Sequence, residues 1–239
     1  VEAELIFSDL IVTEKRLERL DRDRKKIKSA DLEHEFEILG RVRAALESNT
    51  PLRQMQVSGE DEKRIRGFQF LSQKPMLYVL NIGEDEAPRL HEIEAQYREG
   101  PLAGKAGAVA VAICGKVEAE LADLEPGEAR EYLASFGLEE PGLERVISAT
   151  CGLLGLISFL TASETEVHAW IIPAGSTALR AAGAVHTDFE KKFIRAEVVD
   201  WKHLVDAGGY AGARERGWLR LEGKEYIVKD GDVLLIRHG

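Results

Sequence analysis

Residues 74–84 read Lys-Pro-Met-Leu-Tyr-Val-Leu-Asn-Ile-Gly-Glu, and this stretch decides the fold. Met76–Leu80 is an unbroken apolar run, typical of a short strand buried on both faces of a parallel α/β sheet. Ligands of such sheets bind beyond the carboxyl ends of the strands, where Asn81 and Glu84 stand. An amide both donates and accepts, and a carboxylate accepts from N–H groups, so the pair can read the edge of a nucleobase. From these residues alone, an ordinary polar turn remains the alternative.

A second strand candidate, Ala106–Ile113, is small and apolar and ends in Cys114-Gly115-Lys116. A helix is predicted to follow directly over residues 117–124, so polar groups again stand at the carboxyl end of a strand. The apolar spacing also predicts helices over residues 88–99, 126–136 and 143–160.

The first part of the chain shows helical periodicity. One apolar seam runs from Leu10 to Ile27 and a second from Leu32 to Leu46, with a short charged stretch between them, which predicts an antiparallel helical hairpin. A third helix is expected to start near Ser58 and to carry Ile65, Phe68 and Leu71. A basic cluster would lie at the hairpin tip, either as a solvated helix end or as a contact to a phosphate backbone. Its members are Arg22, Arg24, Lys25, Lys26 and Lys28.

The last part of the chain is predicted to contain short strands and turns. Short strands are predicted over 167–172, 194–199, 219–221, 226–228 and 233–237, with helical turns over 187–193 and 201–207, which indicates a ubiquitin-like β-grasp module. Lys191, Lys192 and Arg195 are candidates for a second RNA contact, or else belong to an ordinary mixed surface because acidic residues interleave with them.

Composition narrows the classes of function. With 44% hydrophobic and 31% charged residues the chain is predicted to be globular, and no apolar run approaches the roughly 20 residues of a membrane span. Cys114 and Cys151 fit neither a metal site nor a disulfide framework, so we expect a reducing cytoplasm. His186 and Asp188 lack a third ligand and are expected to be structural; no catalytic or metal-binding set is expected. Residues 75–159 carry 15 acidic but six basic side chains, which opposes nucleic-acid binding by the middle of the chain.

Two long stretches carry a resemblance to a known family. Residues 182–198 and 219–233 closely resemble the TGS domain of the YchF/Obg-like ATPase family. The order of the preceding segments is similar as well, including Lys74-Pro-x-x-Tyr-Val-x-Asn81 and Lys116-x-Glu-x-Glu-Leu121, so that the resemblance covers essentially all 239 residues.

The resemblance implies a site for a nucleotide base. In that family Asn-x-x-Glu replaces the Asn-Lys-x-Asp of GTPases and ATP is favoured over GTP, so Asn81 and Glu84 would read the base, with Ile82 between them. Cys114-Gly115-Lys116 matches the family's Ser-Ala-Lys turn, which lines the other side of the base. Because Ser has become Cys here, a backbone contact could survive but a serine-hydroxyl contact could not.

The resemblance also shows a departure. Family members hold phosphates and Mg²⁺ through a Gly-x-x-x-x-Gly-Lys-[Ser/Thr] loop, and that motif is absent from the 239 residues. Gly100–Ala106 is one residue too short and precedes a strand, so it is a decoy. With a start at Val1, we expect a fragment that is inactive alone, ATP or GTP and Mg²⁺ being held through missing segments.

These inferences combine into one expectation. The fold would be α/β and α+β, with a coiled-coil hairpin at residues 1–74, the C-terminal half of a P-loop NTPase sheet at 75–160 and a TGS β-grasp domain at 161–239. The function would be nucleotide binding by a translation-associated protein that contacts the ribosome or its RNA and does not enter membranes. A non-catalytic RNA- or protein-binding module is the alternative. Strands severed from their neighbours would leave an exposed sheet edge open to self-association.

Overall fold

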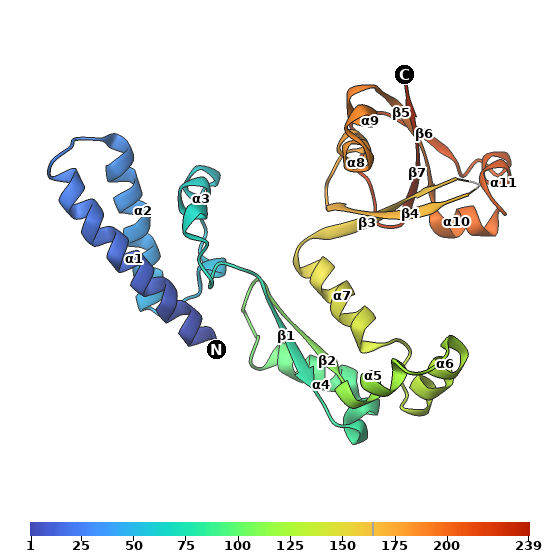
Figure 1. The fold of residues 1–239 in the computed structure, drawn as a ribbon, viewed down its shortest axis with the longest axis horizontal. Coiled ribbons are helices and arrows are strands. Elements are labelled where there is room, and N and C mark those ends of the chain that lie inside the picture. Colours follow the sequence, from blue (N-terminus) through green and yellow to red (C-terminus); the bar gives the residue numbers. More distant parts are fainter. Residues whose placement is uncertain (164) are drawn as a thin grey trace. The chain divides into compact units, whose positions relative to one another are not determined.

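The chain begins with two long helices that lie side by side, α1 (Glu2–Arg24) and α2 (Ala30–Glu47), in the computed structural model, which describes residues 1–163 and 165–239 (Figure 1). Their facing apolar side chains are buried, and the Arg16 guanidinium binds both carboxylate oxygens of Glu35 at 2.8 Å across the pair. The predicted helical hairpin is therefore present. Ile27 does not belong to its seam, because the helix ends at Arg24 and Ile27 is exposed.

Short helical segments extend the hairpin core. They are η1 (Leu52–Gln54), α3 (Gly59–Ile65) and η2 (Arg66–Phe68). Ser58 caps α3 as expected, but the helix ends at Ile65, so Phe68 and Leu71 lie beyond it. The buried carboxylate of Asp9 accepts hydrogen bonds from the Leu71 and Ser72 backbone N–H groups at 2.9 and 2.7 Å and ties this segment to α1.

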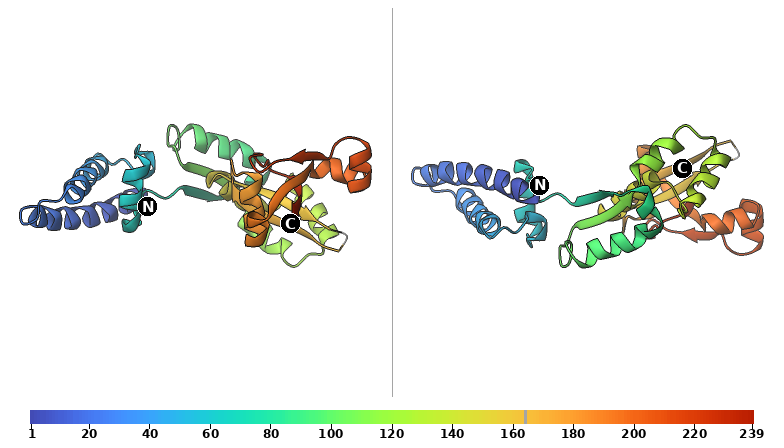
Figure 2. Two further views of the ribbon diagram at one scale, coloured as in Figure 1. Left: turned by 90° about the horizontal axis from the view of Figure 1, so that it is seen from above. Right: turned by 90° about the horizontal axis from the view of Figure 1, so that it is seen from below.

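The middle segment contains a two-stranded parallel sheet, β1 (Met76–Asn81) and β2 (Ala108–Ile113). Between them come η3 (Glu84–Arg89) and α4 (Leu90–Glu99), and α4 lies along one side of the strand pair (Figure 2). The helices α5 (Gly115–Leu121), α6 (Pro126–Ser135) and α7 (Gly142–Leu153) follow. The expectation that Met76–Leu80 is buried on both faces is wrong, because no residue of β1 is fully buried and β2 is its only strand partner among the described residues.

The second unit, Thr150–Gly239, is built on a five-stranded mixed sheet of order β4-β3-β7-β5-β6. Its strands are β3 (Leu156–Ala162), β4 (Val167–Pro173), β5 (Phe193–Asp200), β6 (Arg220–Glu222) and β7 (Asp232–His238). The connections contain α8 (Ala178–Val185), α9 (Thr187–Lys191), α10 (Trp201–Asp206) and α11 (Tyr210–Glu215). Phe159, Val198 and Leu234 form the centre of a core that α8 covers on one face of the sheet.

Two predictions for this region are wrong. The helix expected over 143–160 stops at Leu153, because Gly155 adopts a left-handed φ of 63° and the chain continues as β3. The strand expected over 226–228 is reduced to a single bridge between Ile227 and Thr177, and β7 pairs with β5 and β3 instead. The mixed α/β class with a parallel sheet agrees with expectation.

Candidate functional site

The carboxyl ends of β1 and β2 meet the first turn of α5. The two strands are in register up to Asn81 and Ile113, and the Ile82 N–H donates to the Ile113 carbonyl at 2.9 Å. At this point the Gly115 N–H donates to Oδ1 of Asn81 at 3.0 Å. The strand pairing thus brings together two segments that are more than 30 residues apart in the sequence.

The bond from Gly115 fixes the orientation of the Asn81 amide. A backbone N–H can only donate, so the Asn81 atom that faces it must be the oxygen. The Nδ2 group is then left to donate in another direction. A Cβ at position 115 would lie 3.0 Å from this oxygen, so a side chain there would push the amide outward. Glycine therefore allows the short approach.

Glu84 begins η3 and forms an ion pair with Lys116, whose Nζ lies 2.7 Å from Oε2. Both side chains are partly accessible to solvent. The hydrogen bond from Lys116 to the Glu84 carboxylate, together with the attraction between their charges, raises the pKa of Lys116 above its ordinary value. Lys116 therefore stays protonated and neutralises Glu84, while Oε1 remains an acceptor.

Cys114 stands at the N-cap of α5, with its side chain only 2% exposed and packed among Val117 and Leu133. Its thiol belongs to the core, and only its backbone can face a ligand. Ile82 packs against the same cluster.

Tyr132 and Glu120 are two residues at this site that the sequence analysis missed. The Tyr132 hydroxyl donates to the Glu120 carboxylate, and this bond, helped by burial, raises the pKa of Tyr132 to about 12. Tyr132 comes from α6 and Glu120 from α5, and the Tyr132 ring packs against the Cys114 cluster. No spacing rule connects two helices joined by a loop, so the sequence carries no signal for the pair.

The remaining candidates have other surroundings. His186 accepts a hydrogen bond from the Asp188 N–H and caps α9, a structural role as expected. Lys105, in the decoy loop, binds Glu2 at 3.0 Å. Lys191, Lys192 and Arg195 are exposed on the second unit. Within residues 1–163 and 165–239, no cluster of His, Cys, Asp and Glu is suited to a metal ion, and no helix is long and apolar enough to cross a bilayer.

Comparison with known proteins identifies the family. The chain is 42% identical over 239 residues to the ribosome-binding ATPase YchF of Bacillus subtilis, a match that covers 99% of this chain and 64% of that protein. It is 42% identical over 234 residues to the ribosome-binding ATPase YchF of Escherichia coli O157:H7, with 98% and 63% covered. The chain belongs to the YchF family. A family model described as YchF-GTPase_C, a protein of unknown function (DUF933), matches residues 156–239.

A solved structure agrees with the assignment to the YchF family, and a second one shares the fold. The YchF GTPase of Schizosaccharomyces pombe is similar with a TM-score of 0.80 and 27% identity, covering 99% of this chain and 64% of that one. A GTP-binding protein from Pyrococcus horikoshii OT3 is similar in fold, with a TM-score of 0.52 and 20% identity, covering 100% of this chain and 70% of that chain. The chain thus spans 64% of the length of the first curated YchF relative it matches.

Proposed function

We infer that this YchF-family chain supplies the base-recognition corner of a nucleotide site in a translation-associated ATPase. The observation that carries this proposal is the hydrogen bond from the Gly115 N–H to Oδ1 of Asn81, which turns Nδ2 away as a donor. Glu84 lies at the same end of the strand pair with one carboxylate oxygen uncommitted. The corner therefore offers one donor and one acceptor.

That pair of groups matches adenine better than guanine. Adenine presents an acceptor at N7 beside a donor at its N6 amino group, whereas guanine presents acceptors at both N7 and O6. Nδ2 of Asn81 can donate to N7, and the Glu84 carboxylate can accept from the N6 amino group. With guanine the carboxylate would face a carbonyl oxygen, which is repulsive. The corner is thus expected to favour ATP over GTP.

Lys116 supports this reading of the base. Its ammonium group binds Oε2 of Glu84 and so holds the carboxylate in place while offsetting the cost of removing it from water. Ile82 and Cys114 belong to the same apolar cluster, which packs next to this corner. Cys114, Gly115 and Lys116 face the base through the backbone and the ion pair.

Binding of the phosphates and Mg²⁺ is a different question from recognition of the base. The 239 residues contain no phosphate-binding loop motif, and the described residues offer no suitable cluster of metal ligands. The residues present therefore do not fit Mg²⁺, and no step of ATP hydrolysis is assigned to this chain. Base recognition is its share of the activity that the names of its relatives describe.

Ribosome binding is proposed through the hairpin, which we assign as the coiled coil, and through the β-grasp unit, which we assign as the TGS domain. Two members of the basic cluster at the hairpin tip are less available to a phosphate group, because they already have partners. Arg24 pairs with Asp21 and Glu33 and stacks over Phe36 at 3.8 Å, and Lys25 also pairs with Asp21. These two cations are already compensated.

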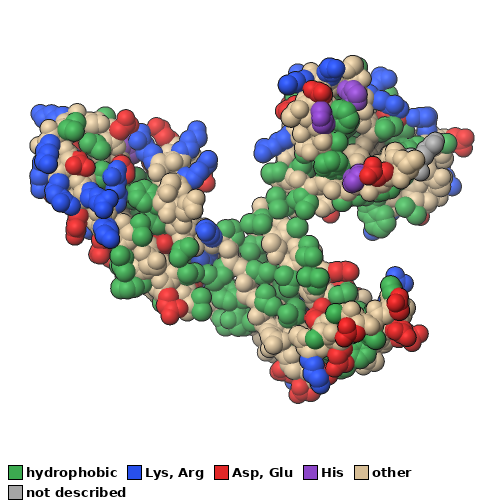
Figure 3. Space-filling model, viewed as in Figure 1, with side chains coloured by type: hydrophobic (Ala, Val, Ile, Leu, Met, Phe, Trp, Pro, Cys, Tyr) green, Lys and Arg blue, Asp and Glu red, His purple; other side chains and the backbone are tan. Residues whose placement is uncertain are grey.

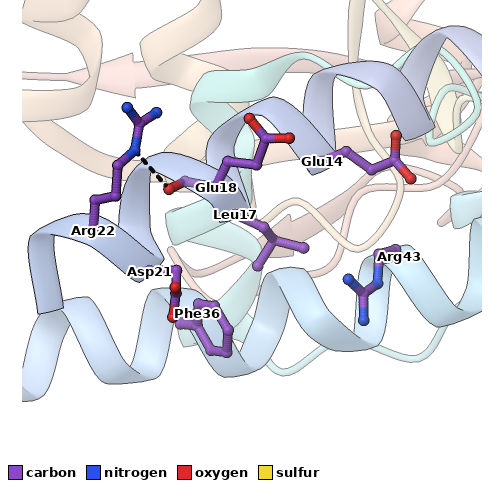
Figure 4. Close-up of a pocket in the computed structure, with 7 residues that line it drawn as sticks. All are labelled: Glu14, Leu17, Glu18, Asp21, Arg22, Phe36 and Arg43. Atoms are coloured by element: carbon purple, nitrogen blue, oxygen red, sulfur yellow. Dashed lines mark hydrogen bonds between the residues drawn. The ribbon is translucent and has the colours of Figure 1, made fainter. Parts of the chain in front are cut away.

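A better phosphate-binding surface runs along the outer side of α1. Three exposed basic residues recur there at intervals of four and three, so they share one face of the helix, and basic side chains gather on the hairpin in Figure 3. They are Lys15, Arg19 and Arg22, and the exposed Lys26 follows in the turn just beyond the end of α1. The hollow of about 730 Å³ between the helices suits phosphate less well, because its lining contains more carboxylates than cations (Figure 4). The charged residues of the lining are Glu14, Glu18, Asp21, Arg22 and Arg43.

Binding to an RNA duplex measured against salt concentration tests the α1 surface. A phosphate contact predicts affinity that falls steeply with salt and a shallower slope when Lys15 and Arg19 become Gln. An unchanged slope in that double variant would remove α1 from the interface. This surface also favours the second candidate function, an RNA-binding module without catalytic activity of its own.

The base site is tested by exchanging its recognition groups within the full-length protein. Glu84→Asp combined with Ile82→Lys, which restores the GTPase-like pattern, should shift the ratio of ATP to GTP affinity toward GTP by about 1–3 kcal/mol, roughly 5- to 150-fold. Calorimetric titration with both nucleotides measures the shift. Asp85→Asn is the matched control, because Asp85 is the exposed acidic neighbour of Glu84 and should leave the ratio unchanged.

Two outcomes would contradict the proposal. Equal effects on ATP and GTP in the double variant would show that Asn81 and Glu84 do not discriminate the base. Magnesium-dependent ATP turnover by the purified 239-residue chain would show that the phosphates are held here after all; we expect no turnover and at most weak binding, since base contacts alone must offset the immobilisation of the ligand.

A further inference from the structure

The two edge strands of the five-stranded sheet differ in protection. β6 has three residues, and two of them, Arg220 and Glu222, are charged. β4 has seven residues, Val-His-Ala-Trp-Ile-Ile-Pro, without a single Asp, Glu, Lys or Arg. Natural sheets shield their edges by short length and by charge, because an open edge pairs with other chains. β6 has both devices, and β4 has neither along its length until Pro173.

One face of β4 is also apolar and exposed. Val167 and Ile171 are 65% and 59% exposed, and Ala169 lies between them on the same face. Their register partners on β3 include Leu160 and Ala162, which pack against the cluster under α10 and α11. On this face of the sheet the helical cover therefore reaches β3 but leaves β4 in solvent.

We propose that β4 is an interface in which two copies of this chain pair edge to edge, with the two β4 strands antiparallel. Centred on Trp170, such pairing sets Val167 opposite Pro173 and Ala169 opposite Ile171. All of these positions are odd-numbered, so their side chains lie on the same face of the strand. The exposed apolar side chains of the two copies therefore form one continuous face. This inference is independent of the proposed nucleotide site.

Charge favours a second copy as the occupant. Because β4 carries no formal charge, its self-pairing brings no like charges together, although the chain as a whole has a net charge of −10. A nucleic acid would gain nothing from an uncharged apolar row. Pairing about a two-fold axis uses the β4 edge of both copies, so the contact closes on itself at the dimer.

Sedimentation velocity on the whole chain over about a hundredfold range of concentration is the direct test, since association follows mass action. The wild-type mass should rise toward that of two copies. Ile171→Lys, which places a charge opposite its counterpart's apolar row, should remain monomeric at every concentration. Leu221→Lys is the matched control, because Leu221 is equally exposed on the other edge strand and its variant should dimerise like the wild type.

Hydrogen exchange of the wild type keeps the proposal testable if Ile171→Lys does not fold. Backbone amides of residues 167–173 should gain protection as concentration rises, whereas those of 220–222 should not. A wild-type chain that stays monomeric throughout would overturn the proposal and leave the edge to an extended segment of another protein. Concentration-dependent protection confined to 76–81 and 108–113 would also overturn it, by placing association at β1 and β2.

Discussion

The chain contains two sheets made of the same kinds of residues but completed to different degrees. In the two-stranded sheet no residue of β1 is buried, and Val79 at its centre is 46% exposed. In the five-stranded sheet four consecutive residues of β5 are buried, and Phe159 is fully enclosed. An apolar strand sequence therefore does not create a core by itself; neighbouring strands on both edges and a helix on each face do.

Polar contacts contribute more to the packing around the two-stranded sheet, where the apolar core is thin. The buried carboxylate of Glu94 accepts from the Ala112 N–H at 2.7 Å and pairs with Arg145. The Glu118 carboxylate accepts from the first two N–H groups of α7, at Gly142 and Leu143. These carboxylates hold α4, α5 and α7 near the strand pair in place of a second layer of apolar side chains.

Hydrogen exchange should show the largest difference between the two sheets. We expect the amides of residues 76–80 to exchange at least about a hundredfold faster than those of 194–199, because local opening of the smaller sheet exposes little buried surface. Exchange monitored by NMR or mass spectrometry measures this. Strong, concentration-independent protection of β1 and β2 in a monomer would show that the two-stranded sheet is completed internally.

Truncation of one apolar side chain in each sheet sharpens the comparison. Phe159→Ala should lower the free energy of unfolding of the second unit by about 3–5 kcal/mol, since it leaves a cavity in an enclosed core. Val79→Ala, the matched change in the small sheet, should cost less than about 0.5 kcal/mol because its side chain is largely in solvent.

Denaturant titration separates these two effects. All three tryptophans, Trp170, Trp201 and Trp218, lie in the second unit, so their fluorescence reports on that unit alone. The fluorescence midpoint should shift in Phe159→Ala, whereas far-UV circular dichroism, which also follows the first unit, should show no shift of that unit's midpoint in Val79→Ala. A comparable loss of stability in both variants would mean that Val79 is covered in solution.

The smallest expected effect concerns two tyrosines, one in each unit, whose pKa values are raised to about 12 for different reasons. For Tyr132 the main cause is its hydrogen bond to Glu120, whereas for Tyr226 it is burial, followed by the bond to Asp232. Glu120→Gln should therefore return the pKa of Tyr132 toward 10, while Asp232→Asn should leave that of Tyr226 raised. NMR titration of labelled tyrosine carbons distinguishes the two.

The sign of the accompanying stability change follows from linkage. Each tyrosine ionises near pH 10 when unfolded but near 12 when folded, so its contribution is complete below pH 10 and is lost as the pH rises toward 12. Glu120→Gln should remove the part of this loss that comes from Tyr132. Identical behaviour of both variants would show that the two environments do not differ.

Much of this architecture follows from sequence patterns that act locally. The seams of α1 and α2, the Ser58 cap and the strand at Met76 are set by residues within one or two turns, and the structure has them. The convergence of Asn81 with Gly115 also follows from the general rule that parallel strands end at one edge.

The secondary-structure predictions are wrong where pairing with residues distant in the sequence decides the local structure. Residues 156–160 are apolar except for Ser158, so their period could not separate a strand from a helix; pairing with β4 and β7 makes them a strand. Residues 226–228 have a strand-like composition, yet β7 takes β5 and β3 as its partners. The pairing of Tyr132 with Glu120 likewise depends on how two helices pack, which no local pattern encodes.

The order of the strands has a consequence for synthesis. β7 occupies the middle of the five-stranded sheet, although it is the last of the five strands to be made. Until residues 232–238 leave the ribosome, β3–β4 and β5–β6 are two separate hairpin-like halves without hydrogen bonds to each other. The enclosure of Phe159 by Leu234 therefore waits for the final strand, and a nascent chain carries both halves with their inner edges open. Any delay in the emergence of residues 232–238 would prolong that vulnerable stage.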